Sequence, residues 1–219
     1  ADGMVAVHAA GIIHRDLAAR NVMVFNIDAT DVSKTLVKVS DYGLSVDAGA
    51  GGYMRTSGNT VPPIRYMPPE AIRRRVWTNA SDVWSFGVVM WEVFSDGSFP
   101  YGDIAADEDV AQRVREEALR LTQPANCPAA VWTVVESCWA ADRTQRPSFV
   151  QLRILLQELR AGVSPAVILP SPTDAAEVEA HPRQITLTLQ VGPEKNVDVS
   201  LSEDATVMDV QEWIQALES

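Results

Sequence analysis

The sequence has few of the features that mark a secreted scaffold, a membrane-spanning chain or a nucleic-acid-binding protein. Its 219 residues contain two cysteines, Cys127 and Cys138, too few for a disulfide framework and typical of reduced thiols in the cytoplasm. No apolar run is long enough to span a membrane, and no signal peptide opens the chain. A net charge of −11 argues against nucleic acid as a partner.

Basic side chains are scarcest in the last quarter of the chain. Residues 163–219 carry two basic and ten acidic side chains, whereas residues 1–162 have a net charge of −3. Proline and small residues predominate in 163–183, which is typical of a linker. The sequence therefore predicts one sizeable domain over 1–162, a proline-rich linker, and a small acidic module over 184–219.

Five short motifs follow one another along the first domain. A single short motif can match by chance, whereas five motifs in a fixed order are specific for a protein family. They are H-R-D-L-A-A-R-N at 14–21, D-Y-G at 41–43, P-I-R-Y-M-P-P-E at 63–70, D-V-W-S-F-G at 82–87, and Cys138-Trp139 followed by Arg146-Pro147. Over residues 3–161 the chain resembles a protein kinase catalytic domain, and more narrowly a tyrosine kinase of the receptor type.

This resemblance implies transfer of the γ-phosphoryl group of ATP to a protein tyrosine, with Mg²⁺ as cofactor. Asp16 then accepts the proton of the substrate hydroxyl, and Arg20 stabilises charge near the transferred phosphate. Asn21 and Asp41 hold Mg²⁺ against the nucleotide phosphates, and Gly43 completes the motif of Asp41. The partner is a tyrosine-containing protein.

Two segments favour tyrosine over serine or threonine as the acceptor. Serine/threonine kinases usually carry a lysine two residues after the catalytic aspartate, where this chain has Ala18-Ala19-Arg20. Pro63-Ile64-Arg65 resembles the platform on which a substrate tyrosine ring lies in the tyrosine kinases. The expected location is the cytoplasm, or the cytoplasmic side of the plasma membrane if the parent protein is a receptor.

The resemblance also assigns supporting roles near the catalytic loop. His14 is expected to pack beneath Tyr42 rather than act as a base, and the hydroxyl that distinguishes Tyr42 from the usual phenylalanine needs a partner if buried. Asp82 is expected to accept backbone N–H groups of the catalytic loop. Arg15 pairs either with a phosphorylated residue of the activation segment or with a backbone carbonyl.

Two further assignments concern the activation segment, which is rich in glycine between 44 and 60. Glu70 and Arg146 resemble the buried ion pair that links this segment to the last helices, so that losing one would strand a charge. Tyr53 lies where such kinases are phosphorylated, and an ordinary exposed loop tyrosine is the competing interpretation.

The fold expected is mainly α-helical, with one small β-hairpin. Helices are predicted over 1–10 and, hydrophobic on nearly every side, over 81–95, while Pro128 and Pro147 are predicted to open two further helices in their first turns. Short β-branched runs at 22–25 and 36–39 predict the hairpin.

The module over 184–219 shows a different pattern. Period-two alternation at 185–191 and 197–201, with a turn between and an amphipathic stretch after Ser202, predicts a ββα unit. This order resembles the opening of a ubiquitin-like β-grasp domain, and it stops before the remaining strands of that fold. The acidic tail is also a candidate docking module for a protein partner.

The nucleotide-binding half of a kinase has no counterpart in these residues. No Gly-x-Gly-x-x-Gly precedes the catalytic loop, and the three lysines, Lys34, Lys38 and Lys195, all follow it. We therefore expect a C-terminal-lobe fragment, inactive alone, with Tyr42 and the hairpin near Val24 and Leu36 exposed. The alternative is a non-catalytic interaction protein that uses the lobe and the tail for docking.

Overall fold

The computed structural model is organised around one buried helix, α3 (Asn79–Phe94). It describes residues 1–28, 30–31, 34–49, 52–55, 63–162, 185–190 and 196–201. Ten of the sixteen residues of α3 are buried, among them Trp84 and Val88. The central helix predicted over 81–95 is therefore confirmed. In the described part of the chain, no helix has the length and apolar character needed to cross a membrane.

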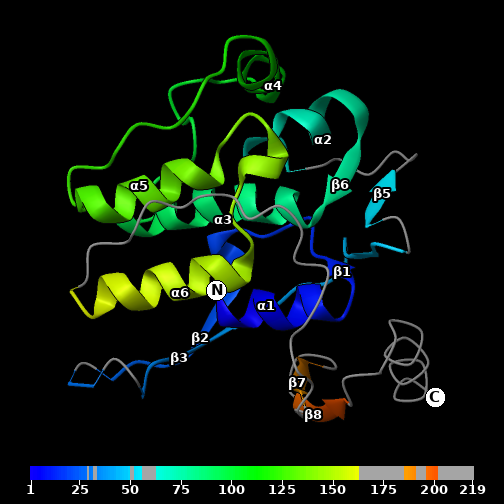
Figure 1. Cartoon of the computed structure of the whole chain (residues 1–219), viewed down its shortest axis with the longest axis vertical. Helices are drawn as coiled ribbons and strands as arrows, with labels where there is room; N and C mark the ends of the chain where they lie inside the picture. The colour runs from blue at the N-terminus through cyan, green and yellow to red at the C-terminus, as the bar shows by residue number, and fades with distance from the viewer. Residues whose placement is uncertain are drawn as a thin grey trace.

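Other helices surround α3 and bury it (Figure 1). It packs against α5, which packs against α6, and α6 in turn contacts α1. On the other side α2 lies against α4. The bounds are α1 Asp2–Ala9, α2 Pro69–Arg74, α4 Asp107–Glu116, α5 Ala129–Cys138 and α6 Phe149–Arg160, with short 3₁₀ turns η1 Ala19–Asn21, η3 Ile64–Tyr66 and η4 Arg143–Gln145.

The two predicted prolines stand just outside their helices rather than in the first turn. Pro128 is the N-cap of α5, and Pro147 precedes Ser148, the N-cap of α6. Ser148 and Gln151 form a capping box in which each side chain accepts the other residue's backbone N–H. The serine cap therefore opens α6, and the proline only sets the direction of the chain that enters it.

The strands form four two-stranded sheets in the described residues. Each pair is antiparallel, and β2 with β3 forms the predicted hairpin. The bounds are β1 Ile12–Ile13, β2 Val22–Asn26, β3 Leu36–Val39, β4 Val46–Asp47, β5 Tyr53–Arg55, β6 Val76–Thr78, β7 Ile185–Gln190 and β8 Asn196–Leu201.

The β2–β3 hairpin carries apolar side chains that the rest of the lobe does not cover. Val24 is 55% exposed and Leu36 48%, as predicted, and Ile27 just beyond β2 is 74% exposed. Tyr42 differs from its prediction, because it is half-buried. Its ring packs against His14, which removes part of it from solvent.

The C-terminal module is described only through its two strands. β7 and β8 pair antiparallel over six residues each, with Ile185 opposite Leu201 and Gln190 opposite Asn196. The two predicted strands therefore pair with each other. The linker predicted over 163–183 and the helix predicted after Ser202 lie outside the described residues.

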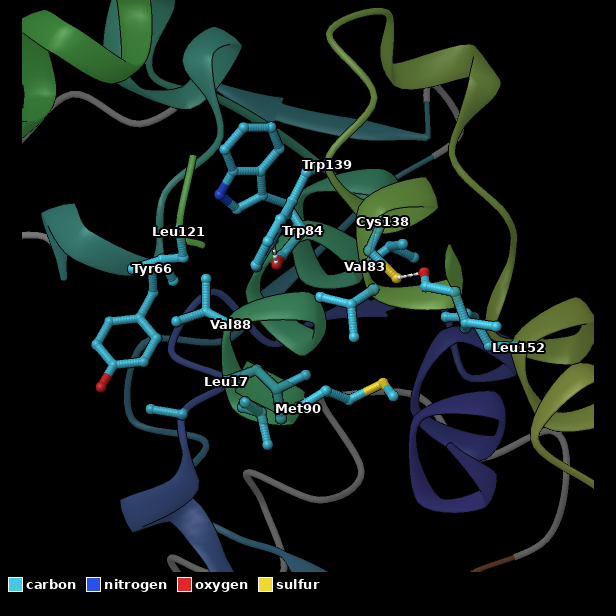
Figure 2. Packing of buried hydrophobic residues seen from close by; sticks show 14 of the residues in the cluster. Leu17, Tyr66, Val83, Trp84, Val88, Met90, Leu121, Cys138, Trp139 and Leu152 are labelled. Carbon is cyan, nitrogen blue, oxygen red and sulfur yellow. Dashed lines mark hydrogen bonds between the residues drawn. The ribbon is translucent and has the colours of Figure 1, made fainter. Parts of the chain in front are cut away.

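Gly87 in the middle of α3 has the closest neighbours of the glycines that the structure describes. A Cβ at this position would lie 2.6 Å from Nε1 of Trp139 and 2.9 Å from Cβ of Cys138. Figure 2 shows these two side chains over α3, with the Trp139 indole donating a hydrogen bond to the carbonyl of Trp84. Only glycine allows this approach of α5 to α3.

We expect Gly87→Ala to destabilise the lobe although alanine favours helix. Overpacking costs about 1–3 kcal/mol, whereas the propensity gain offsets only about 1 kcal/mol. Gly3→Ala in α1 is the matched control, because its Cβ would meet nothing closer than 3.5 Å. Urea unfolding should show a lower midpoint for Gly87→Ala and an unchanged or higher one for Gly3→Ala. Equal shifts would contradict the packing argument.

Candidate catalytic site

The catalytic loop is held by a carboxylate at the start of α3. Asp82 is fully buried, and its two oxygens accept the backbone N–H groups of His14 (2.8 Å) and Arg15 (2.9 Å). The contact predicted for Asp82 is present. Because both donors come from the loop itself, α3 fixes the backbone immediately before Asp16.

Three functional side chains meet at the end of this loop. Asp16 is buried, and its Oδ2 accepts a hydrogen bond from the amide nitrogen of Asn21 at 2.9 Å. That nitrogen also donates to the Asp16 carbonyl at 2.7 Å. Arg20, half-exposed, forms an ion pair with Oδ1 of Asp16. The η1 turn brings these residues together, because it reverses the chain between Asp16 and Asn21.

Asp41 is positioned through its neighbour in the sequence. The N–H and hydroxyl of Ser40 both donate to the carbonyl of Asn21, at 2.9 and 3.1 Å. Asp41 follows with a left-handed backbone (φ 64°), and its exposed carboxylate accepts the N–H of Gly43 at 3.2 Å. Ser40, the residue before the second motif, is therefore hydrogen-bonded to Asn21, the last residue of the catalytic loop.

The rings of His14 and Tyr42 pack against each other, as predicted. Their ring centroids are 5.0 Å apart, and Nε2 of His14 lies 3.1 Å from the Ser40 carbonyl. Burial raises the pKa of Tyr42 above its ordinary value, so its hydroxyl stays protonated at neutral pH. His14 is fully buried, which suits a packing role better than proton transfer with substrate.

Arg15 takes the second of its two predicted partners. Its guanidinium donates to the carbonyl of Leu44 at 3.0 Å and lies 4.9 Å from the centroid of the Trp77 ring. Tyr53 is 54% exposed at the start of β5, opposite Thr78. This exposure suits a phosphorylation site and an ordinary surface tyrosine alike.

Glu70 and Arg146 form a two-pronged ion pair across 76 residues of sequence. Arg146 donates from both terminal nitrogens to the two carboxylate oxygens, at 2.7 and 2.9 Å. It also binds the carbonyls of Ala80 and Ala140, and its side chain is fully buried. This arginine therefore connects α2, the start of α3 and the segment before α6.

Arg65 belongs to the predicted platform segment, and its partners lie beyond α3. The side chain is buried, and it donates to the carbonyls of Tyr101 and Ile104 and to the carboxylate of Asp107. It therefore anchors the loop before α4. The sequence pattern gave no sign of this, because all of these acceptors lie more than 30 residues away.

The oxygen donors at the site are of the kind that Mg²⁺ prefers. Since the Asn21 nitrogen faces Asp16, the amide oxygen of Asn21 and the exposed carboxylate of Asp41 are the oxygens that could bind a cation. The described residues contain no cluster of three or more His, Cys, Asp or Glu that could enclose a metal. Mg²⁺ needs no such cluster, because it binds through one or two protein oxygens together with phosphates and water. The donor set therefore fits.

A model of the family described as protein tyrosine and serine/threonine kinase matches residues 1–156. The chain belongs to the protein kinase family. Ephrin type-A receptor 1 of Mus musculus and of Homo sapiens are each 36% identical over 219 residues, 99% of this kinase chain and 20% of each receptor. Ephrin type-A receptor 5 of Gallus gallus is 43% identical over 162 residues, 73% of this chain and 15% of the receptor.

The kinase chain thus spans about a fifth of the length of the type-A receptor 1 proteins it matches, 20% in both. Its kinase region is receptor-tyrosine-kinase-like, as the motifs predicted. Alignment with receptor 1 continues beyond residue 162 into the acidic module, whereas alignment with receptor 5 covers 162 residues in all.

Two residues that support the catalytic loop of this kinase chain were not predicted from the sequence. Nε2 of His8 lies 2.9 Å from Oδ2 of Asp82, and Glu92 accepts the N–H of Ala19 at 2.9 Å. Glu92 supports the loop from α3, which is distant in sequence, whereas His8 in the neighbouring α1 acts through Asp82. Their only sequence signal is a polar residue within an otherwise apolar helix, which by itself names no partner.

Proposed function

We propose that this chain is the catalytic, C-terminal lobe of a protein tyrosine kinase. The observation that carries the proposal is the buried carboxylate of Asp16, oriented by Asn21 and paired with Arg20. Asp16 takes the proton of the substrate phenol. The phenol oxygen then bonds to the γ-phosphorus, the bond to the β–γ bridging oxygen breaks, and ADP leaves with that electron pair.

Other residues hold charge and geometry during this transfer. The amide oxygen of Asn21 and the carboxylate of Asp41 would hold Mg²⁺, which neutralises charge on the phosphates when bound. Arg20 extends from Asp16 toward solvent, with half its side chain exposed, and its guanidinium supplies a positive charge near the transferred group. Asp82 and His14 keep the loop in place from below.

Tyrosine as the acceptor is supported by the absence of lysine at position 18. Ala18 is fully buried, so no side chain from this position reaches the cleft, and the cation that pairs with Asp16 is Arg20. Arg20 lies over the ring of Tyr66, 5.1 Å from its centroid, at the edge of the platform segment. With the cation at Arg20 instead of position 18, the acceptor site suits a phenol, which is longer than a serine side chain.

We further propose the assignment of 1–162 to the kinase lobe, 163–183 to a linker and 184–219 to a partial ββα module of ubiquitin-like type. The buried, reduced cysteines are consistent with work in the cytoplasm or at the cytoplasmic side of the plasma membrane. Substrates are tyrosine-containing proteins, and the acidic module is a second candidate contact for a protein partner.

The exposed hairpin favours a second function, that of a docking module without catalysis. Val24, Ile27 and Leu36 would give such a module an apolar contact surface. Phosphate transfer by the chain joined to a nucleotide-binding lobe separates the two functions, because only a kinase performs it. Isothermal titration with ATP and Mg²⁺ first establishes that the joined protein binds nucleotide.

We expect the 219-residue chain alone to bind no ATP and to transfer no phosphate, since positioning supplies much of phosphoryl-transfer catalysis. Joined to the nucleotide-binding lobe of an ephrin receptor, it should phosphorylate a Glu/Tyr copolymer and not a serine/threonine peptide. A silent fusion that binds ATP would favour docking. Turnover by the chain alone that depends on Asp16 would contradict the first expectation.

A further inference from the structure

The C-terminal end of α2 carries an exposed group of arginines. Arg73, Arg74 and Arg75 are consecutive, and all three are exposed. The pairing of β5 with β6 adds exposed Arg55, which lies opposite Val76. Nε of Arg55 is 3.5 Å from the carbonyl oxygen of Arg74, so the two residues are neighbours in space. Figure 1 shows α2, β6 and β5 together at one edge of the lobe. Arg55, Arg73 and Arg74 are called the arginine patch below.

The lobe does not neutralise the arginine patch. In the described part of the chain, none of its three guanidinium groups forms an ion pair with a carboxylate. Arg73 donates instead to the carbonyl of Arg115 in α4. The two arginines of α4 are by contrast each paired with a glutamate close by in sequence. Like charges that lie close together repel one another, so an anionic group bound at the patch would be stabilising.

Interaction with the helix dipole explains only part of the patch. Cations in the last turn of a helix are favourable there, which accounts for Arg73 and Arg74 at the end of α2. Arg55 lies on β5, where no helix end is available to it. Tyr53 lies two residues before Arg55, and therefore on the same face of the strand. The patch thus extends from α2 onto the activation segment.

The acidic module over 184–219 has the charge that the patch lacks. It contains seven acidic side chains and a single basic one, Lys195. The 21 residues of 163–183 that join it to the lobe can span up to about 70 Å when extended, whereas a lobe of about 160 residues has a radius of gyration of about 15 Å. The module can therefore reach any face of the lobe.

Tethering favours this module over a separate anionic partner. A group joined by a flexible linker has an effective concentration that reaches the millimolar range. Nucleic acid and anionic membrane surfaces are disfavoured in comparison, because the chain as a whole carries a net charge of −11 and repels them.

We propose that the arginine patch is an intramolecular docking site for the acidic module of the same chain. The contact is made by guanidinium groups that bind carboxylates, a pairing that arginine can form through two parallel hydrogen bonds. Because β5 belongs to the activation segment, docking connects the module to the segment that carries Tyr53. The inference rests on the proposed assignment of 184–219 to a separate module, and it does not depend on phosphate transfer.

The test is paramagnetic broadening, measured by NMR on the 219-residue chain. A nitroxide spin label is attached at Ser219→Cys, since both natural cysteines are buried. At low salt the backbone amide signals of β6 should lose at least half of their intensity relative to the chain with the reduced label, whereas those of α5 should change little. Raising the salt from about 0.1 M to 1 M shortens the Debye length from about 10 Å to about 3 Å, so the β6 signals should recover.

Charge variants show whether the patch itself is responsible. The patch variant replaces its three arginines by glutamine, and the low-salt broadening of β6 should disappear. The matched control removes the same number of positive charges from η4 and α6 and should leave the broadening unchanged; it combines Arg143→Gln, Arg153→Gln and Arg160→Gln. Absence of broadening in the original chain, or its persistence in the patch variant, would overturn the inference.

A mixed sample distinguishes docking within one chain from contact between two copies. It contains spin-labelled chain without isotope enrichment and isotope-enriched chain without the label. The β6 signals should keep their full intensity in this mixture. Broadening as large as in the singly prepared chain would assign the contact to a second copy and overturn the intramolecular site. No readout involves ATP, so the outcome is independent of whether the chain proves to be a catalytic lobe.

Discussion

Asp16→Asn, in the chain joined to a nucleotide-binding lobe, is expected to lower kcat by a factor of about 10²–10⁴, the usual contribution of a positioned general base. Asn21 and Arg20 donate to different oxygens of Asp16, so the single asparagine oxygen keeps one of these two bonds, and the buried Asp82 still holds the loop backbone. What it loses is the ability to take the phenol proton. The KM for the Glu/Tyr copolymer should therefore change little, because Asp16 contributes to the transition state more than to binding. Initial rates over a range of copolymer concentrations give both constants.

The control for this experiment is Asp142→Asn. Asp142 is exposed and caps the η4 turn by accepting the N–H of Thr144, on a segment that holds none of the proposed catalytic residues. Its kcat should stay within about twofold of the original protein. A fall of less than tenfold in Asp16→Asn, with an unchanged melting temperature, would remove Asp16 from the role of base. Equal falls in both variants would point to loss of folding rather than of chemistry.

The sequence predicted those parts of the site whose partners share a motif or a short segment. Asp16, Arg20 and Asn21 lie within six residues, and one turn brings them together whatever surrounds it. The central helix was predictable because it is apolar on nearly every side, a pattern with few alternatives. The pairing of β2 with β3 follows from two β-branched runs close together in the chain.

Contacts between distant polar residues were predictable only through the family resemblance. Asp82 and the Glu70–Arg146 pair could be named because their positions match kinase motifs, and the structure contains both contacts. Glu92 and His8 match no quoted motif, and a buried polar residue gives no sign in the sequence of which backbone group it will meet. Arg65 does stand inside a motif, and its partners are still carbonyls after α3 that no local pattern identifies.

Arg146→Met should be the most destabilising of the single substitutions considered. Breaking a buried ion pair from one side costs about 3–5 kcal/mol, because the remaining charge loses its partner in a low-dielectric site. Here the loss strands Glu70, whose side chain is only 18% exposed, and frees the carbonyls of Ala80 and Ala140. The guanidinium also lies 5.0 Å from the centroid of the Trp84 ring, so packing is lost with the charge. At roughly 2–4 °C per kcal/mol for a chain of this size, the melting temperature should fall by about 6–20 °C.

Two comparisons make this result specific to the pair rather than to the loss of any arginine on these helices. Arg153→Met removes a partly exposed arginine of α6 that stands 4.0 Å from Asp2, an ion pair worth at most about 1 kcal/mol. Its melting temperature should fall by no more than a few degrees. The double variant Glu70→Met with Arg146→Met removes both charges and should recover stability relative to Arg146→Met alone, because no carboxylate is then stranded. If circular dichroism melts show the double variant to be the less stable of the two, the cost lies in the lost packing around Trp84 and the carbonyls rather than in the stranded charge.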